Sequence, residues 1–143
     1  MAIALETTFI ENRALVQPDD TNNHDTAHGG HVAKWMDEVG ALSAMRFAGA
    51  DVVTASMRNI DFHAPIPRGD AALIRAFVAA AGRTSMEVAL SVHREDTRTA
   101  ETQLTSDAMF TYVALDPDGV PTAVPELDAS SPAAAELLEP LDR

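Results

Sequence analysis

Cysteine is absent from this chain of 143 residues, so no disulfide can form. Proteins without disulfides are typical of the reducing cytoplasm, which is the compartment we expect. Long apolar runs are missing too, and no signal-peptide pattern opens the chain, so neither a membrane span nor export is expected. Internal repeats are also absent, so any pairing of identical units must come from two copies of the chain.

Basic residues are scarce. The chain has 22 acidic residues against nine arginines and a single lysine, Lys34, and its formal net charge is −12. Such a surface repels nucleic acid and anionic lipid, so we expect neither as a partner. Carboxylates in place of lysine, with small Ala and Val in place of large apolar residues, resemble the halophile pattern. We therefore expect a protein that works in high salt, where screening relieves self-repulsion.

The length is that of one domain, large enough for a core and typical of units that gain burial by oligomerising. We expect this domain to occupy residues 1–127. Residues 128–143 mix proline, alanine and acidic side chains, and this tail forms a short helix or remains mobile.

A Gly-Gly pair stands at the predicted start of a long helix. Gly29 and Gly30 lead into a proline-free run of good helix formers that extends to Ala48. The unpaired N–H groups at such a start, with the positive end of the helix dipole, suit an anion or an oxygen that develops negative charge. Helical spacing predicts one buried face, made of Val32, Trp35, Met36, Val39 and Leu42.

Asp37 lies on a second face of this helix, where the side chains are small and neighbouring backbone can come close. The members of this face are Ala33, Gly40, Ala41, Ala44 and Ala48. Lys34 and Glu38 form an i, i+4 pair on the solvated side. A carboxylate with small neighbours is a candidate base, and an ordinary surface aspartate is the alternative that spacing leaves open.

Strands are predicted after the helix. The clearest alternation of apolar and polar residues lies in residues 84–93. The other predicted strands are residues 52–62, 71–80 and 107–115, with a fifth around residues 7–16. Short linkers carry the proline and glycine of turns. One long helix with a run of antiparallel strands predicts an α+β domain with the sheet packed on the helix.

Four motifs identify a family. HGGHVAKWMDEVGALSAMRFAG, VVTASMRNIDFHAPIPRGD, GRTSMEV and FTYVALDPDGVPTAVPEL, in this order and spacing, resemble the hotdog-fold acyl-CoA thioesterases of the cytosolic acyl-CoA hydrolase type. The resemblance covers residues 10–127. It implies a hotdog fold, in which a curled antiparallel sheet of five to six strands wraps the long helix. It also implies a homo-oligomer, with at least a dimer required and tetramer and hexamer left open, and acyl-CoA as the substrate.

The resemblance also implies the site residues. Asn22 and Asp37 match the family's asparagine and aspartate, and are expected to meet across the interface from different protomers. Asn23 is adjacent and leaves a one-residue ambiguity. The chain departs from the family pattern at Asp25, where a glycine is usual, and His28 stands where phenylalanine or histidine is found.

Thioester hydrolysis needs an activated water and a stabilised carbonyl oxygen. We assign Asp37 as the general base and Asn22 as the amide that orients water or thioester. The backbone N–H of Gly30, with His31, supplies the oxyanion donors. Direct attack by Asp37 through an anhydride is the competing route. No serine nucleophile with a base is evident, and no cofactor is expected beyond the CoA of the substrate.

The turn Arg83, Thr84 and Ser85 matches the family's strand entry near the CoA nucleotide and pantetheine. Arginine can bind phosphate bidentately and a hydroxyl can bond the pantetheine amides, although a plain turn is the alternative. Arg58 and Arg68 are weaker phosphate candidates.

Three histidines, His24, His28 and His31, could in principle serve zinc. They straddle the glycine pair and a turn into helix, so no regular geometry places all three on one ion, and we expect no metal site.

Two other functions remain open. A hotdog domain could bind acyl-CoA without hydrolysing it, but the presence of both Asn22 and Asp37 argues against this. A hotdog enoyl-CoA hydratase would pair an aspartate with a histidine, which His24 or His31 could supply, but the strand motifs match the thioesterases better.

Overall fold

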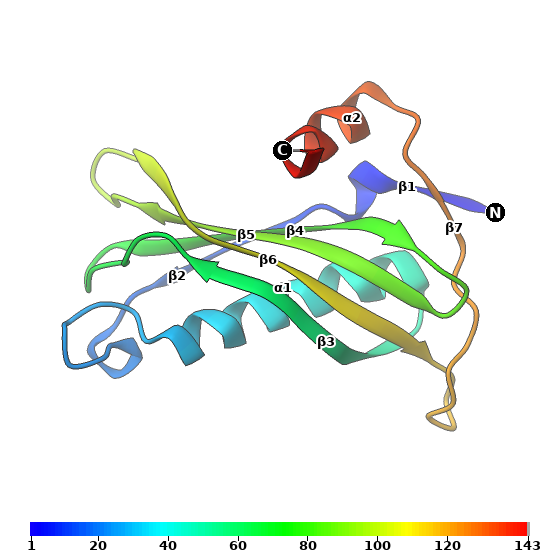
Figure 1. The fold of residues 1–143 in the computed structure, drawn as a ribbon, viewed down its shortest axis with the longest axis horizontal. Coiled ribbons are helices and arrows are strands. Elements are labelled where there is room, and N and C mark those ends of the chain that lie inside the picture. The colour runs from blue at the N-terminus through cyan, green and yellow to red at the C-terminus, as the bar shows by residue number, and fades with distance from the viewer. Residues whose placement is uncertain (143) are drawn as a thin grey trace.

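The computed structural model describes residues 1–142 and consists of an antiparallel five-stranded sheet with a long helix, α1 (Gly29–Ala48), across one face (Figure 1). The strands in spatial order are β2 (Ile10–Leu15), β4 (Ala71–Ala81), β5 (Ser85–Glu95), β6 (Thr102–Leu115) and β3 (Asp51–Phe62). The sheet packs on the helix without closing into a barrel. The predicted α+β hotdog fold is confirmed.

The core between sheet and helix follows from alternation along the central strand β5. Met86, Val88, Leu90 and Val92 are all buried in the main hydrophobic cluster, as the period of two predicts. Ala89, which points to the opposite face, is also buried because it belongs to a second, smaller cluster. The centre of the sheet is therefore covered on both faces.

Helix α1 has defined ends. His28 is the N-cap residue, and its Nδ1 accepts the N–H of Gly30 at 2.9 Å. Gly49 ends the helix with a left-handed φ of 64°, a conformation that glycine adopts without steric cost.

The buried stripe of α1 is partly as predicted. Val32, Met36 and Val39 are buried and Trp35 is half-buried, whereas Lys34 and Glu38 are exposed as expected. Leu42 was predicted to be buried and is 48% exposed. The prediction was wrong because the buried stripe continues through smaller residues and leaves Leu42 on its flank. The buried residues of this part of the helix are Gly40, Ser43, Ala44 and Phe47.

The remaining elements lie around the sheet. They are β1 (Ala2–Ala4), η1 (Leu5–Thr8), η2 (Pro18–Asp20), β7 (Glu126–Asp128), α2 (Pro132–Leu138) and η3 (Glu139–Asp142). Strands β1 and β7 pair in parallel, which ties the N-terminal segment to the segment before α2. Helix α2 lies on the outer face of the sheet, opposite α1 (Figure 1). None of the helices within residues 1–142 combines the length and apolar character needed to cross a bilayer.

Strand β3 forms an open edge of the sheet. It is 12 residues long, and within residues 1–142 it pairs only with β6. It carries exposed apolar side chains, with Val53 47%, Met57 44% and Phe62 54% exposed. A long apolar edge strand is a ready template for pairing with another chain. This edge therefore offers backbone groups and apolar side chains to a partner chain.

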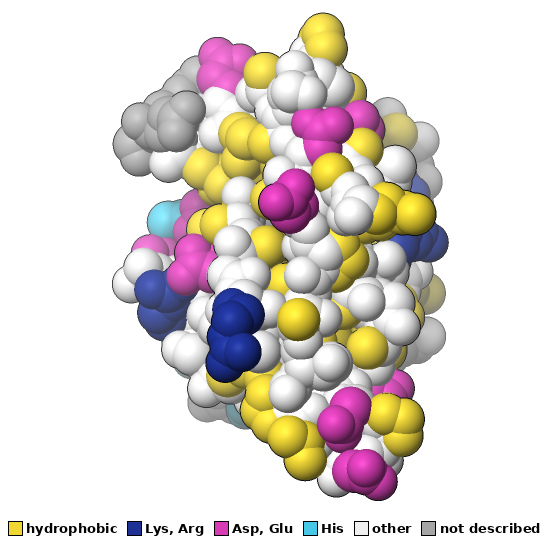
Figure 2. All heavy atoms as spheres, turned by 90° about the vertical axis from the view of Figure 1, so that its right-hand side faces the viewer, with side chains coloured by type: hydrophobic (Ala, Val, Ile, Leu, Met, Phe, Trp, Pro, Cys, Tyr) yellow, Lys and Arg dark blue, Asp and Glu magenta, His cyan; other side chains and the backbone are white. Residues whose placement is uncertain are grey.

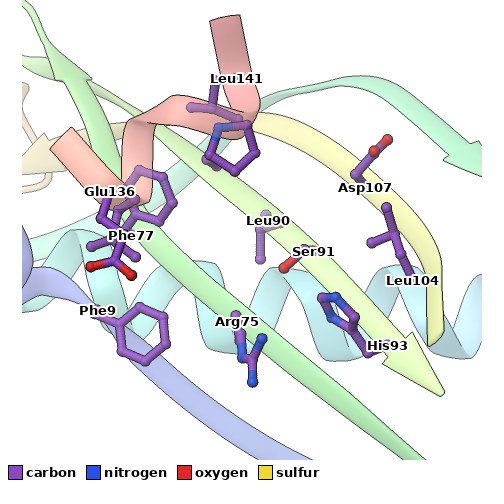
Figure 3. A pocket seen from close by; sticks show the side chains of 13 residues that line it. Phe9, Arg75, Phe77, Leu90, Ser91, His93, Leu104, Asp107, Glu136 and Leu141 are labelled. Atoms are coloured by element: carbon purple, nitrogen blue, oxygen red, sulfur yellow. The ribbon is translucent and has the colours of Figure 1, made fainter. Parts of the chain in front are cut away.

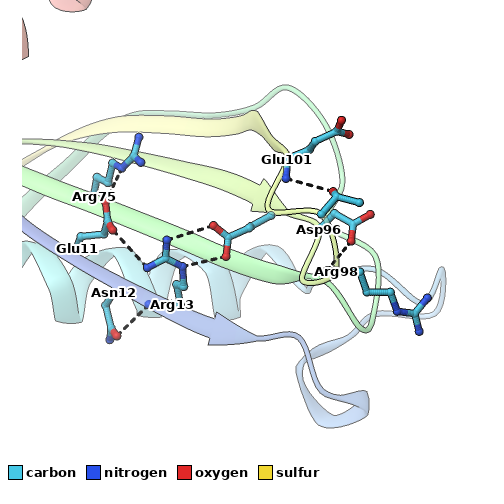
Figure 4. Close-up of polar contacts among 9 residues, drawn as sticks. Glu11, Asn12, Arg13, Arg75, Asp96, Arg98 and Glu101 are labelled. Carbon is cyan, nitrogen blue, oxygen red and sulfur yellow. Dashed lines mark hydrogen bonds and ion pairs between the residues drawn. The ribbon is translucent and has the colours of Figure 1, made fainter.

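Acidic side chains are spread over the surface. On the face shown in Figure 2 they are scattered among apolar and uncharged groups. Several arginines are already engaged by carboxylates, as in the cluster of Glu11, Arg13, Arg75 and Glu95 (Figure 4). Their positive charges are therefore largely neutralised locally.

Candidate active site

The Asp37 carboxylate is half-buried and held by two hydroxyl groups. Thr54 Oγ1 donates to Asp37 Oδ1 at 2.7 Å, and the Tyr112 hydroxyl lies 2.9 Å from the same oxygen. Thr54 and Tyr112 are cross-strand partners on β3 and β6, so a single row of the sheet delivers both donors. Asp37 is therefore oriented by the fold, unlike a freely moving surface aspartate. Because both bonds reach Oδ1, Oδ2 remains able to accept a proton.

Tyr112 is fully buried, and Gly40 makes room for it. A Cβ at position 40 would lie 2.5 Å from the Tyr112 hydroxyl oxygen, so the small face of α1 allows the approach that its composition predicts. Burial, and then the hydrogen bond to Asp37, raise the pKa of Tyr112 well above its usual value. The hydroxyl consequently stays protonated and acts as a hydrogen-bond donor.

Asn22 lies in the loop before α1 and organises it. Its Oδ1 accepts the backbone N–H groups of His24 at 2.8 Å and Thr26 at 3.3 Å, and its Nδ2 lies 3.1 Å from Thr26 Oγ1. It also lines a cavity of about 300 Å³ beside Gly29 and Phe62. Asn23 is exposed and does not line this cavity. The ordered amide of this loop is that of Asn22.

Within one chain, Asn22 and Asp37 do not share a site. Asn22 lies beside the start of α1, near Phe62 at the end of β3, whereas Asp37 contacts Thr54 near the start of β3. Asp37 is the eighth residue after Gly29 along the helix, which is about 12 Å of helix axis. Both positions nevertheless lie along the same open edge of the sheet.

Asp25 keeps the loop shape that a glycine would give. Its φ is 63°, in the left-handed region that aspartate enters more readily than most residues. Its carboxylate pairs with Arg68 at 3.1 Å, and its carbonyl oxygen accepts the Arg68 N–H at 3.1 Å. Arg68 is therefore engaged by the loop, and a phosphate would have to displace the Asp25 carboxylate to bind it.

The start of α1 offers backbone donors, one of which is occupied. The Gly30 N–H, predicted to be an oxyanion donor, is capped by His28 Nδ1 in this structure. The first N–H groups of a helix have no intrahelical partner, so the N–H of His31 belongs to the same set. A carbonyl oxygen could bind Gly30 only after the His28 ring moves away, whereas His31 needs no such change.

The histidines near the helix start pack on one another. The rings of His28 and His31 are edge-to-face with centroids 5.7 Å apart, and His31 lies 6.3 Å from the Trp35 ring. Among residues 1–142, no group of three or more histidine, aspartate or glutamate side chains is placed to hold a metal ion.

The contacts of the predicted CoA-binding residues show which of them has a charge available for a phosphate. Arg83 is exposed in the turn between β4 and β5, followed by the half-buried Thr84 and Ser85. Arg58 on β3 instead forms an ion pair with Glu87, so its charge is already compensated. Arg83 is the better candidate for a phosphate.

Sequence reasoning missed Thr54 and Tyr112. Both are polar residues at strand positions that face the helix, and Tyr112 is the only tyrosine of the chain. A buried tyrosine hydroxyl requires a hydrogen-bond partner, which was the signal available. The partner could not be identified before the register of β3 and β6 was known.

Family comparison adds a direct match. The thioesterase superfamily model matches residues 24–101. An uncharacterised acyl-CoA thioester hydrolase of Bacillus subtilis is 37% identical over 127 residues, covering 85% of this chain and 74% of that protein. The cytosolic acyl coenzyme A thioester hydrolase of Rattus norvegicus is 35% identical over 115 residues, covering 79% of this chain and 30% of the rat protein.

Solved structures are similar over nearly the whole chain. An acyl-CoA hydrolase from Staphylococcus aureus, in complex with butyryl-CoA and CoA, has a TM-score of 0.90 and 33% identity, covering 99% of this chain and 87% of that one. An apo-hexameric acyl-CoA thioesterase has a TM-score of 0.89 and 38% identity, covering 99% and 90%. Variants of the S. aureus enzyme replace an asparagine, an aspartate and a threonine, which are spaced as Asn22, Asp37 and Thr54 are here.

Proposed function

This chain belongs to the thioesterase superfamily, and from that premise we propose that it hydrolyses acyl-CoA to free CoA and a carboxylic acid. The resemblance to acyl-CoA hydrolases seen in the sequence motifs is confirmed by these relatives. The observation that carries the proposal is the Asp37 carboxylate, fixed by Thr54 and Tyr112 with one oxygen left for a proton. Binding of acyl-CoA alone would not require such an arrangement.

We assign Asp37 as the general base. Its Oδ2 takes a proton from a water, whose oxygen attacks the thioester carbonyl carbon. The Asn22 amide orients the water or the thioester. The N–H of His31, joined by that of Gly30 once the His28 ring has moved off it, receives the carbonyl oxygen as negative charge develops on it. The C–S bond then breaks, and the CoA sulfur takes up the proton.

A dimer formed through β3 would complete this site. If two β3 strands pair antiparallel about their middles, the start of one strand lies beside the end of the other. Asp37 is near the start of β3 through Thr54, and Asn22 is near its end through Phe62. Asp37 would then face the partner's Asn22. The hexameric relative supports an assembly of at least a dimer, and we infer a hexamer built from such dimers.

We assign Arg83, Thr84 and Ser85 to CoA. The exposed Arg83 guanidinium can bind a phosphate of CoA bidentately, and the adjacent hydroxyls can bond the pantetheine amides. Arg58 could join them only by exchanging its Glu87 partner for a phosphate. We therefore give Arg58 a secondary part.

The experiment that tests the function is thiol release from a panel of acyl-CoAs, from short to long chains, with the purified native chain. Hydrolysis of any member, giving equal amounts of CoA and acid, supports the assignment and reveals the chain-length preference. Tight binding of acyl-CoA without thiol release, in dilute buffer and in molar KCl, would contradict it.

Tyr112→Phe is expected to lower kcat about tenfold, because the aspartate loses a hydrogen bond to its charged form. The measurement is kcat and kcat/KM for thiol release, with thermal unfolding as the control for folding. An unchanged kcat with reduced stability would assign Tyr112 a purely structural part.

We also propose that the protein works in concentrated salt. With a net charge of −12, its carboxylates repel one another and the polyanionic CoA, and at about 1 M salt the Debye length falls to about 3 Å. We expect a higher unfolding temperature and faster thiol release in molar KCl than in dilute buffer. Sucrose at equal osmolality is the control, since it stabilises without screening charge. Equal stability and activity in dilute buffer and molar KCl would refute this proposal.

A further inference from the structure

A second cavity lies on the outer face of the sheet, away from Asp37. Its volume is about 490 Å³, which is within the usual range for ligand sites. Most of its wall is apolar. Phe9 and Phe77 line one end, Leu104 lies at the other, and Leu141 of η3 covers it (Figure 3). Leu137 of α2 also lines it. The sheet separates this cavity from α1.

Three polar side chains lie together on the floor of this cavity. Arg75 on β4 and Ser91 on β5 are direct cross-strand partners, and His93 follows Ser91 on the same face of β5 (Figure 3). Arg75 donates from Nε to Glu11 at 2.8 Å, and no other hydrogen bond from Arg75 occurs within residues 1–142. Most of its five N–H donors therefore remain available to a ligand.

His93 has an unsatisfied ring atom. Its Nδ1 is buried and has no hydrogen-bond partner among the described residues. Burial, together with the nearby Arg75 charge, lowers the pKa of His93, so the imidazole is neutral at neutral pH. A buried polar atom without a partner is costly, and because Nδ1 is closed to solvent, a ligand in the cavity relieves that cost only if the His93 ring turns.

We propose that this cavity binds an amphipathic monocarboxylic acid, with its carboxylate on Arg75, Ser91 and His93 and its hydrocarbon tail along Phe9, Phe77 and Leu137. A guanidinium binds a carboxylate through two parallel hydrogen bonds. A turn of the neutral His93 ring that brings Nδ1 to the cavity would add a donor in the tautomer that carries hydrogen on Nδ1. The proposal does not depend on the thioesterase assignment, because neither Asp37 nor Asn22 lines the cavity.

The charges around the cavity limit the head group to a single carboxylate. Asp107 and Glu136 also line it, and Glu11 already takes part of the Arg75 charge. A polyanion such as CoA would meet these carboxylates and be repelled. Asp107 itself is paired with His63, 3.3 Å away, so one acidic group is partly compensated.

The test is calorimetric titration of the native protein with octanoate, in molar KCl, with octan-1-ol as the probe that has the tail without the charge. We expect octanoate to bind once per chain and octan-1-ol at least tenfold more weakly. Arg75→Gln should weaken octanoate binding about tenfold, through loss of charge-assisted hydrogen bonds. Ser91→Leu should abolish binding, because it removes a hydroxyl donor and places a leucine side chain where the carboxylate would lie.

Two matched variants complete the design. Arg98→Gln makes the same substitution at an exposed arginine outside the cavity and should leave octanoate binding unchanged. Asp37→Ala should also bind octanoate normally. No binding to the native chain, equal binding of octanoate and octan-1-ol, or full binding in a folded Arg75→Gln protein would each overturn the proposal. So would loss of binding in Asp37→Ala with retention in Ser91→Leu.

Discussion

Replacing Asp37 by alanine is expected to reduce kcat for acyl-CoA hydrolysis about 100- to 10,000-fold, the range that a general base contributes. The change removes the carboxylate that takes the proton from water. It leaves the helix intact, because alanine favours the helix and Asp37 is only half-buried. Thr54 loses its acceptor and Tyr112 keeps only the backbone carbonyl oxygen of residue 37, so a modest loss of stability is expected as well. Thiol release under saturating acyl-CoA measures the effect.

Glu38→Ala is the matched control, since Glu38 is the next residue on α1 and is exposed. It should keep near-native activity and remove the same charge. If Asp37→Ala folds, binds CoA and still hydrolyses at a rate near that of Glu38→Ala, Asp37 is not the base.

A single turnover in ¹⁸O-labelled water distinguishes the two routes open to Asp37. If Asp37 acts as general base, the label enters the product acid in the first turnover. If Asp37 attacks the thioester and the resulting anhydride opens at the aspartyl carbon, the label is found in the Asp37 carboxylate. Mass spectrometry of the acid and of the peptide that contains Asp37 reads both outcomes.

Asn22→Ala is expected to lower kcat about 100- to 1,000-fold, the cost typical of losing one preorganised donor at a reacting carbonyl. Asn22 also holds its loop through His24 and Thr26, so some activity loss will come from loop disorder. Asn23→Ala is the control, because Asn23 is exposed and lies outside the cavity. A larger loss from Asn23→Ala than from Asn22→Ala would reverse the assignment.

Mixing the two inactive variants tests whether the site spans two chains. Asn22→Ala and Asp37→Ala protomers, unfolded together and refolded, should form dimers in which one of the two sites has both native residues. Random pairing makes half of the dimers mixed, so about a quarter of native activity should return. Recovery no greater than the sum of the two separate variants would place Asn22 and Asp37 in the same protomer.

The prediction of the helix and strands from sequence succeeded where local pattern and tertiary packing agree. The alternation in residues 84–93 fixed the inward face of β5, and the Gly-Gly start and the glycine end marked α1. Strand β2 begins at Ile10, later than the predicted 7–16, because residues 5–8 form a 3₁₀ turn. The prediction that Leu42 is buried was wrong. The buried side of α1 contains small residues, so the packing of neighbouring elements, and not helical spacing, decides which flank of the helix is covered.

The sequence by itself determined which functional side chains the protein has and in which order they occur along the chain. The four motifs were sufficient to indicate the family, the candidate base Asp37 and the amide Asn22. Composition also set the acidic charge and excluded disulfides, since neither depends on folding.

Only the tertiary structure decided which partners those groups have. The register between β3 and β6 places Thr54 opposite Tyr112, and with it both donors on Asp37. The cap from His28 onto Gly30 depends on particular torsions of the His28 side chain and backbone. The cavity under α2 brings together residues that are distant in sequence. Hydrogen bonds depend on distances of a few tenths of an ångström, and such distances are set by packing, whereas hydrophobic periodicity is a property of the chain alone.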